Sequence, residues 1–171
     1  MSSLRYKVLR CIAYSIELMV FYILCQVPYL LPPILGVRPV LLIPIALTIA
    51  VLEDQRMGLA FGIAAGLLID LGMGSVLGFH ALLLGLICYA VGFMAVNLVH
   101  TNILTALIVA LLAVGVIFSL QFVFYYYLRG YGYERDVFIE HYLPIMLYTF
   151  IPTPVFYYFN KAFATGIREK D

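Results

Sequence analysis

The sequence predicts a single all-α domain embedded in a membrane, built as a bundle of six transmembrane helices. Three observations predict this fold class. The 171 residues are 65% hydrophobic and only 11% charged, whereas a soluble domain carries about 25% charged residues. The mean hydropathy is +1.06, so the chain holds more apolar surface than one small core can bury. The alternating ten-residue pattern of a transmembrane strand is absent, and helices satisfy their own backbone hydrogen bonds in lipid.

Six apolar segments follow one another along the chain, and each is expected to form one helix of the bundle. A helix needs about 20 mostly apolar residues to cross a membrane. The segments cover residues 11–27, 34–52, 57–69, 76–96, 103–128 and 142–160. The longest exposed connection, residues 129–141, leaves no room for a soluble domain. Residues 1–171 are therefore expected to form one polytopic domain.

Basic residues mark the N-terminus and orient the helices. Arg5, Lys7 and Arg10 precede an apolar run, as in a secretory signal. This run lacks a small-x-small cleavage site and further apolar segments follow it, so we expect it to remain as the first helix. With the N-terminus inside, seven of the ten Lys and Arg residues fall on the inner side and three fall outside: Arg38, Arg129 and Arg135. Because Lys and Arg favour the cytoplasmic side, both termini are expected in the cytoplasm.

The second and third segments are the least regular. Five of the eight prolines lie between residues 28 and 44, and residues 40–52 make only about 20 Å of helix. A re-entrant hairpin is therefore an alternative to two full spans. The polar run Glu53-Asp54-Gln55-Arg56 favours two spans, because four polar side chains cost little at the membrane surface and much at its centre.

Regularly spaced glycines predict close packing between the third and fourth segments. Two sets recur at helical spacing, every four residues in one segment and every seven in the next: Gly58, Gly62 and Gly66, then Gly78, Gly85 and Gly92. Each set lies near one face of a helix. Membrane helices associate by close backbone approach, which small residues allow. We expect these two segments to form the tightly packed centre of the bundle.

Asp70 is placed at the outer end of the third segment, a helix C-terminus where a carboxylate is unfavourable by about 0.3–1 kcal/mol. Two alternatives offset this cost. The residues that follow, including Gly72 and Gly74, are typical of a turn in which the carboxylate accepts backbone N–H groups. Alternatively, Asp70 contacts a partner, either one of the three outer arginines or another molecule.

Glu17 lies within the first segment, where an acidic side chain is by default a candidate functional residue. One alternative is structural: the carboxylate faces the bundle and bonds to a tyrosine or threonine, or pairs with Arg10 on nearly the same helix face. The other is a contact with a ligand or partner. The sequence leaves both open.

Several functional classes are disfavoured by what the sequence lacks. A net charge of +1 argues against nucleic acid as a partner. The Walker, HExxH and GxSxG motifs are missing, so no catalytic residues are expected and the protein is predicted not to be an enzyme. The three cysteines lie in apolar runs without CxxC spacing: Cys11, Cys25 and Cys88. We expect neither a disulfide, nor a metal site, nor a cofactor.

The order of these features resembles the MreD family of rod-shape-determining membrane proteins. The resemblance is carried by the proline-rich entry to the second segment, then Gly58-x3-Gly62-x3-Gly66-Leu67-Leu68-x-Asp70, then Gly74-x3-Gly78-Phe79-His80-Ala81. It implies a non-enzymatic scaffold in the bacterial inner membrane that supports lateral peptidoglycan synthesis and cell shape. The implied partners are the bitopic protein MreC, the MreB filament, the RodA glycosyltransferase and its penicillin-binding transpeptidase.

Two functional hypotheses follow from the resemblance. In the scaffold hypothesis, the outer loop contacts an MreC-like partner through aromatic anchors beside a charge: Tyr131, Tyr133 and Phe138 with Arg135. An alternative role for the tyrosines is to hold the loop at the lipid headgroups. The family also resembles, in helix arrangement, the substrate-binding membrane subunits of energy-coupling vitamin transporters. In that second hypothesis, four polar residues line an outward cavity: Glu17, Gln26, Asp70 and Gln121.

Overall fold

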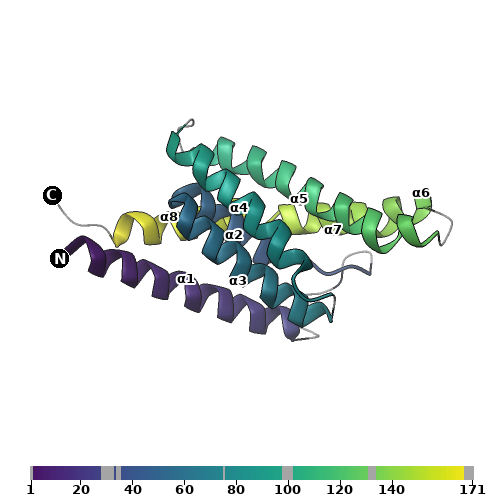
Figure 1. The fold of residues 1–171 in the computed structure, drawn as a ribbon, viewed down its shortest axis with the longest axis horizontal. Helices are drawn as coiled ribbons and strands as arrows, with labels where there is room; N and C mark the ends of the chain where they lie inside the picture. The colour runs from purple at the N-terminus through teal and green to yellow at the C-terminus, as the bar shows by residue number, and fades with distance from the viewer. Residues whose placement is uncertain are drawn as a thin grey trace.

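The computed structural model describes residues 2–27, 33, 36–74, 76–97, 102–130 and 134–167. The first five helices are α1 (Ser2–Gln26), α2 (Leu42–Leu52), α3 (Gln55–Met73), α4 (Phe79–Asn97) and α5 (Ile103–Tyr125). They are followed by the 3-10 turn η1 (Tyr127–Arg129), the short α6 (Glu134–Val137), the π-helical turn η2 (Phe138–Tyr142), α7 (Leu143–Phe150) and α8 (Thr153–Gly166). Figure 1 shows an elongated bundle in which the start of α1 and the end of α8 lie at the same end.

Several of the described helices have the composition of membrane helices, and some also have the length. Three are long and apolar enough to cross a membrane: Arg5–Gln26, Gln55–Met73 and Ile103–Arg129. Leu42–Leu52 and Phe79–Ala95 are shorter apolar helices. Large apolar side chains are exposed along the outer face of α1, among them Ile12, Ile16, Met19 and Ile23. Such a face is stable when lipid rather than water covers it.

Helix α2 occupies the centre of the bundle, a place that the sequence analysis assigned to the third and fourth segments. Every side chain from Leu42 to Val51 is buried, and a helix that is apolar on all sides is typical of such a position. Its 11 residues give about 16 Å of helix, which is too short to cross a hydrocarbon core of about 30 Å. α2 is therefore an inner helix enclosed by its neighbours.

The predicted start of the second segment, at residue 34, was wrong, because the helix begins at Leu42. Pro39 explains the delay, since the residue before a proline is disfavoured in helical conformation. Pro44 is tolerated because it lies in the first turn of α2, where its missing N–H costs no hydrogen bond. The backbone N–H of Val40 instead donates to the Thr149 hydroxyl of α7, at 3.1 Å, which ties the entry of α2 to the C-terminal half of the chain.

The last segment also differs from its prediction as one helix over 142–160. Helical structure begins at Glu134 and is interrupted at Ile151 and Pro152 before α8 continues to Gly166. Pro152 and Pro154 lack the N–H groups that an uninterrupted helix requires. The first helix begins at Ser2, well before the predicted start at residue 11. The remaining segments shift by a few residues, with α3 reaching Met73 and α5 ending at Tyr125.

Helices α3 and α4 pack with their backbones in contact. A Cβ atom added to Gly62 would lie 2.8 Å from the Leu84 carbonyl oxygen, and one added to Gly58 would lie 2.7 Å from the Cys88 carbonyl oxygen. A Cβ on Gly66 would collide with the backbone of Ala81. From the other side, a Cβ on Gly92 would lie 2.8 Å from the Cα of Gln55. At these positions only glycine permits the observed helix separation.

Gly85 and Gly78, two other glycines of the predicted packing set, differ from this pattern. A Cβ on Gly85 would lie 2.7 Å from Ile63 Cγ1, a side-chain atom. Gly78 lies in the turn before α4, with φ +98°, and no described atom is within 4 Å of an added Cβ. The prediction that Gly78 packs a helix was therefore wrong. Its glycine is needed for the left-handed backbone conformation, which other residues adopt at a cost.

We expect Gly66→Ala to lower the free energy of unfolding by about 1–3 kcal/mol, the usual cost of overpacking, because the new methyl group meets backbone atoms that cannot rotate away. Gly115→Ala in α5 is the matched control. Its Cβ would have Met146 Cε at 3.9 Å as nearest contact, so alanine should be neutral or stabilising by up to about 1 kcal/mol. Unfolding in detergent measures both, and equal tolerance of the two changes would contradict the proposed backbone contact.

Candidate functional site

Asp70 is positioned by the end of α3 and the start of α4. It lies one turn before Gly74, which ends α3 in the left-handed conformation with φ +61°. The chain then reverses through residues 76–78 and enters α4 at Phe79. Asp70 is 1% exposed, so its carboxylate is enclosed between the two helices. The turn thus carries an acidic group from the C-terminus of one helix to the N-terminus of the next.

The carboxylate caps the N-terminus of α4. The backbone N–H of Gly78 donates to Asp70 Oδ2 at 2.8 Å, and the N–H of His80 donates to Oδ1 at 3.2 Å. The N–H of Ala81 lies 3.4 Å from Oδ2. These N–H groups have no partner within the helix, and the N-terminal end of the helix dipole attracts negative charge. The unfavourable position at the end of α3 is therefore offset by a favourable one at the start of α4.

His80 adds a side-chain contact to the same carboxylate. Its Nδ1 lies 2.7 Å from Asp70 Oδ1, and the histidine is 3% exposed. The ring also meets the Phe79 ring edge-on, with centroids 5.2 Å apart. The sequence places His80 in the motif that follows Asp70, but a contact between the two side chains was not predicted. The available signal was the ten-residue spacing across a glycine-rich turn, which brings the end of one helix to the start of the next.

Gly72 has a different role from the turn position predicted for it. It lies inside α3, and a Cβ there would be 2.9 Å from Gln26 Nε2 and 3.3 Å from Cε2 of Tyr22, both on α1. The Gln26 amide donates to the Tyr22 hydroxyl at 3.1 Å. Gly72 therefore lets the end of α1 approach α3, while Gly74 alone forms the left-handed cap of α3.

A small cleft lies at this junction of α1, α3 and the entry to α2. Its volume is about 210 Å³, and its lining includes Tyr22, Gln26, Arg38 and Gly72. Of the four polar residues predicted to share an outward cavity, Gln26 lines this cleft. Pockets that bind small molecules usually measure about 300–1,000 Å³, so this cleft is small for a solute site.

The end of α5, α6 and the start of α7 form an arm that extends beyond the ends of α1 and α3, as Figure 1 shows. Aromatic side chains hold the arm together: the Phe122 ring lies 5.2 Å from the rings of both Phe138 and Tyr142. Phe138 is thus half-buried against α5 rather than a free anchor, and Arg135 is exposed. Tyr131 and Tyr133, also predicted to contact a partner, lie outside the described residues.

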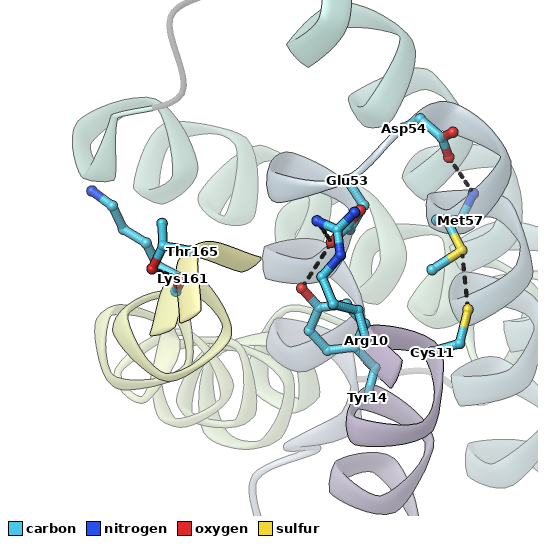
Figure 2. Close-up of polar contacts among 8 residues, drawn as sticks. All are labelled: Arg10, Cys11, Tyr14, Glu53, Asp54, Met57, Lys161 and Thr165. Atoms are coloured by element: carbon cyan, nitrogen blue, oxygen red, sulfur yellow. Dashed lines mark hydrogen bonds and ion pairs between the residues drawn. The ribbon is translucent and has the colours of Figure 1, made fainter. Parts of the chain in front are cut away.

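A second polar cluster lies at the opposite end, near the N-terminus. Figure 2 shows the Arg10 guanidinium of α1 and the Tyr14 hydroxyl converging on Glu53, which follows α2. Arg10 Nη1 lies 2.8 Å from Glu53 Oε1, and the Tyr14 hydroxyl donates to the same oxygen at 3.0 Å. Burial raises the pKa of the Glu53 carboxyl above its ordinary value, and the Arg10 charge opposes that rise. Next to it, the Asp54 carboxylate caps α3 by accepting from the Met57 N–H at 3.0 Å.

Glu17 does not form the predicted pair with Arg10, whose guanidinium is bound to Glu53 instead. Its side chain is 4% exposed. Among the described residues, neither carboxylate oxygen has a hydrogen-bond partner. The sequence could not reveal this change of partner, because Glu53 is far from Arg10 along the chain and reaches it only in the folded bundle.

The fold and these polar clusters define an all-helical membrane protein in which charged groups join one helix to another. Residues 6–164 match the family model described as rod shape-determining protein MreD. No curated protein and no solved structure matches the chain. Because the family model covers nearly the whole sequence, the chain belongs to the MreD family, whose members determine rod shape and are not a known enzyme family.

We expect Asp70→Asn to lower the free energy of unfolding by about 1.5–3 kcal/mol, because it replaces a charged acceptor of buried hydrogen bonds. His80→Ala should cost less, since the backbone donors remain. His80→Asn should cost least, because its amide places an N–H donor near the position of Nδ1. Unfolding in detergent orders the three variants, and an Asp70→Asn protein as stable as the wild type would contradict the capping role.

Proposed function

We propose that this MreD-family chain is a non-enzymatic scaffold of the bacterial rod complex that binds an MreC-like bitopic protein at its outer end. The observation that carries the proposal is the Asp70 cap, which joins α3 to α4 by hydrogen bonds of 2.8 and 3.2 Å to backbone N–H groups. A scaffold benefits from a stiff surface, because ordering a mobile one on binding costs about 0.5–1.5 kcal/mol per immobilised side chain.

The projecting arm supplies the proposed contact surface. It carries exposed Arg135 and Asp136 on a core of aromatic rings packed edge to face. Arginine and aromatic residues are frequent strong contributors at protein interfaces. Through the MreC-like protein, the chain would join MreB, RodA and the penicillin-binding transpeptidase in lateral peptidoglycan synthesis.

The proposed orientation places the arm outside the inner membrane and both termini in the cytoplasm. The excess of basic residues near the termini supports it. So does the position of the start of α1 and the end of α8 at one end of the bundle, opposite the arm (Figure 1). The proposal keeps six membrane crossings. The second crossing cannot be made by α2 alone, because that helix is too short.

Co-purification with the MreC-like partner after co-expression tests the proposed surface. Arg135→Glu should reduce recovery of the complex roughly tenfold, the loss expected for an interface arginine, while the variant itself stays folded because the side chain is exposed. Lys161→Glu is the matched control, since it reverses an exposed charge at the opposite end of the molecule. Equal recovery of the partner with the wild type, Arg135→Glu and Lys161→Glu would exclude the arm from the interface. Loss of binding in both variants would show a general charge effect and equally count against the arm.

A further inference from the structure

Glu17 is the buried acidic group whose chemistry the scaffold leaves unexplained. It is 4% exposed, and neither of its oxygens has a partner among the described residues. An ionised carboxylate without hydrogen bonds is very unfavourable in an apolar surrounding, and more so within a membrane bundle. The side chain must therefore either lose its charge or hold a positively charged group.

On the helix that carries Glu17, the side chains of Arg10 and Tyr14 bind Glu53 rather than Glu17, and Arg10 Nε is buried without a described partner. Figure 2 shows Arg10 and Tyr14 both directed at Glu53, and Tyr14 has one hydroxyl proton, which it donates at 3.0 Å. The Ser15 hydroxyl donates to the Cys11 carbonyl oxygen at 2.8 Å. A partner for Glu17 has to come from a facing helix.

The packing of α1 against α8 identifies the facing residue. The Tyr14 ring lies 6.1 Å from the Phe163 ring, and the Phe21 ring lies 4.9 Å from the Phe156 ring. The two helices therefore run antiparallel, in agreement with Figure 1. Glu17 lies three residues after Tyr14 on α1, and Asn160 lies three residues before Phe163 on α8. In an antiparallel pair of helices, Glu17 and Asn160 therefore lie at the same level. On each helix these residues share one face, since they are spaced by three or four positions.

Asn160, like Glu17, has a buried oxygen without a described hydrogen-bond partner. It is fully buried, and its Nδ2 donates to the Thr48 hydroxyl of α2 at 2.8 Å. Its Oδ1 is buried and has no described partner. An amide oxygen accepts hydrogen bonds and cannot donate them. An ionised Glu17 carboxylate and Asn160 Oδ1 would both be hydrogen-bond acceptors, so they could not bond to each other. A protonated Glu17 has a hydroxyl group that can donate to Asn160 Oδ1.

We propose that Glu17 is protonated in the membrane-embedded protein and that its hydroxyl donates to Asn160 Oδ1. This bond completes a chain from α1 through Asn160 of α8 to Thr48 of α2, whose hydroxyl lies 2.9 Å from the Pro44 carbonyl oxygen. The contact of α1 and α8 with the central helix then depends on one proton. Its release leaves a carboxylate facing an amide oxygen and separates the two helices.

The other titratable groups on these elements do not replace this proton. Arg10 and Tyr14 of α1 serve Glu53, and Tyr157 of α8 has interactions of its own. Lys161 is exposed, with its Nζ 5.6 Å from the centre of the Tyr157 ring. The nearest acidic residues of α3 and its cap, Asp54 and Asp70, bind backbone N–H groups at opposite ends of that helix.

The test compares the full-length protein with Glu17→Gln in lipid nanodiscs between mildly acidic and mildly alkaline pH. Glutamine keeps a donor that reaches Asn160 but cannot ionise. We expect the melting temperature of the wild type to fall more steeply with rising pH than that of Glu17→Gln. The two proteins share every other titratable group, so the difference between their curves reports Glu17. Infrared spectra should show the C=O band of a protonated carboxylic acid in the wild type that is absent from the variant. Glu17→Leu, which has no donor, should be less stable than Glu17→Gln.

Three results would overturn the proposal. One is a carboxylate spectrum for Glu17 at mildly acidic pH. Another is a wild-type protein that sodium or potassium stabilises but protons do not, which would make the site a cation site. The third is a Glu17→Gln protein that is much less stable than the wild type at neutral pH, since this would show that the negative charge itself is needed.

Discussion

The carboxylate of Asp70 and the glycines of α3 act on the same contact and together fix the rest of the bundle. Gly58, Gly62 and Gly66 bring two helix backbones within van der Waals distance, which gains attraction only if the helices keep one register. Asp70 supplies that register, because its hydrogen bonds join the end of α3 to the first turn of α4. A shift of one residue would separate the buried carboxylate from its donors.

The remaining helices follow from this fixed pair. α2 packs beside the pair of α3 and α4, and its side chains from Leu42 to Val51 are buried. The helix can be short, because its neighbours rather than its own length keep it within the membrane. Polar contacts at both ends and in the middle of α2 then attach the surrounding helices. Val40 is held by Thr149 of α7, Glu53 by Arg10 of α1, and Thr48 by Asn160 of α8. Each contact joins segments distant in sequence, so they stabilise one arrangement of the bundle rather than individual helices.

The sequence predicted the helical membrane class and the family, because composition and spacing report them directly. It also predicted two alternatives for Asp70, of which the structure describes backbone N–H contacts at the following turn. Helix spacing alone could not place Gly78, whose role depends on a positive φ, nor the buried position of α2. Arg10 pairs with Glu53 rather than with Glu17. This partner depends on tertiary packing, which no local sequence pattern reports. The partner contacts of Tyr131 and Tyr133 stay a prediction.

The central claim is that a side chain of α3 holds the first turn of α4. Amide hydrogen exchange of the wild-type protein in nanodiscs measures this directly at Gly78 and His80. Both N–H groups belong to a helix start, where exchange is normally fast because no intrahelical acceptor is available. The account predicts exchange at these two positions as slow as at Leu84 in the middle of α4, and about 10–100 times slower than at Leu77 in the turn, which corresponds to a charged hydrogen bond. Exchange at Gly78 and His80 as fast as at Leu77 would contradict it.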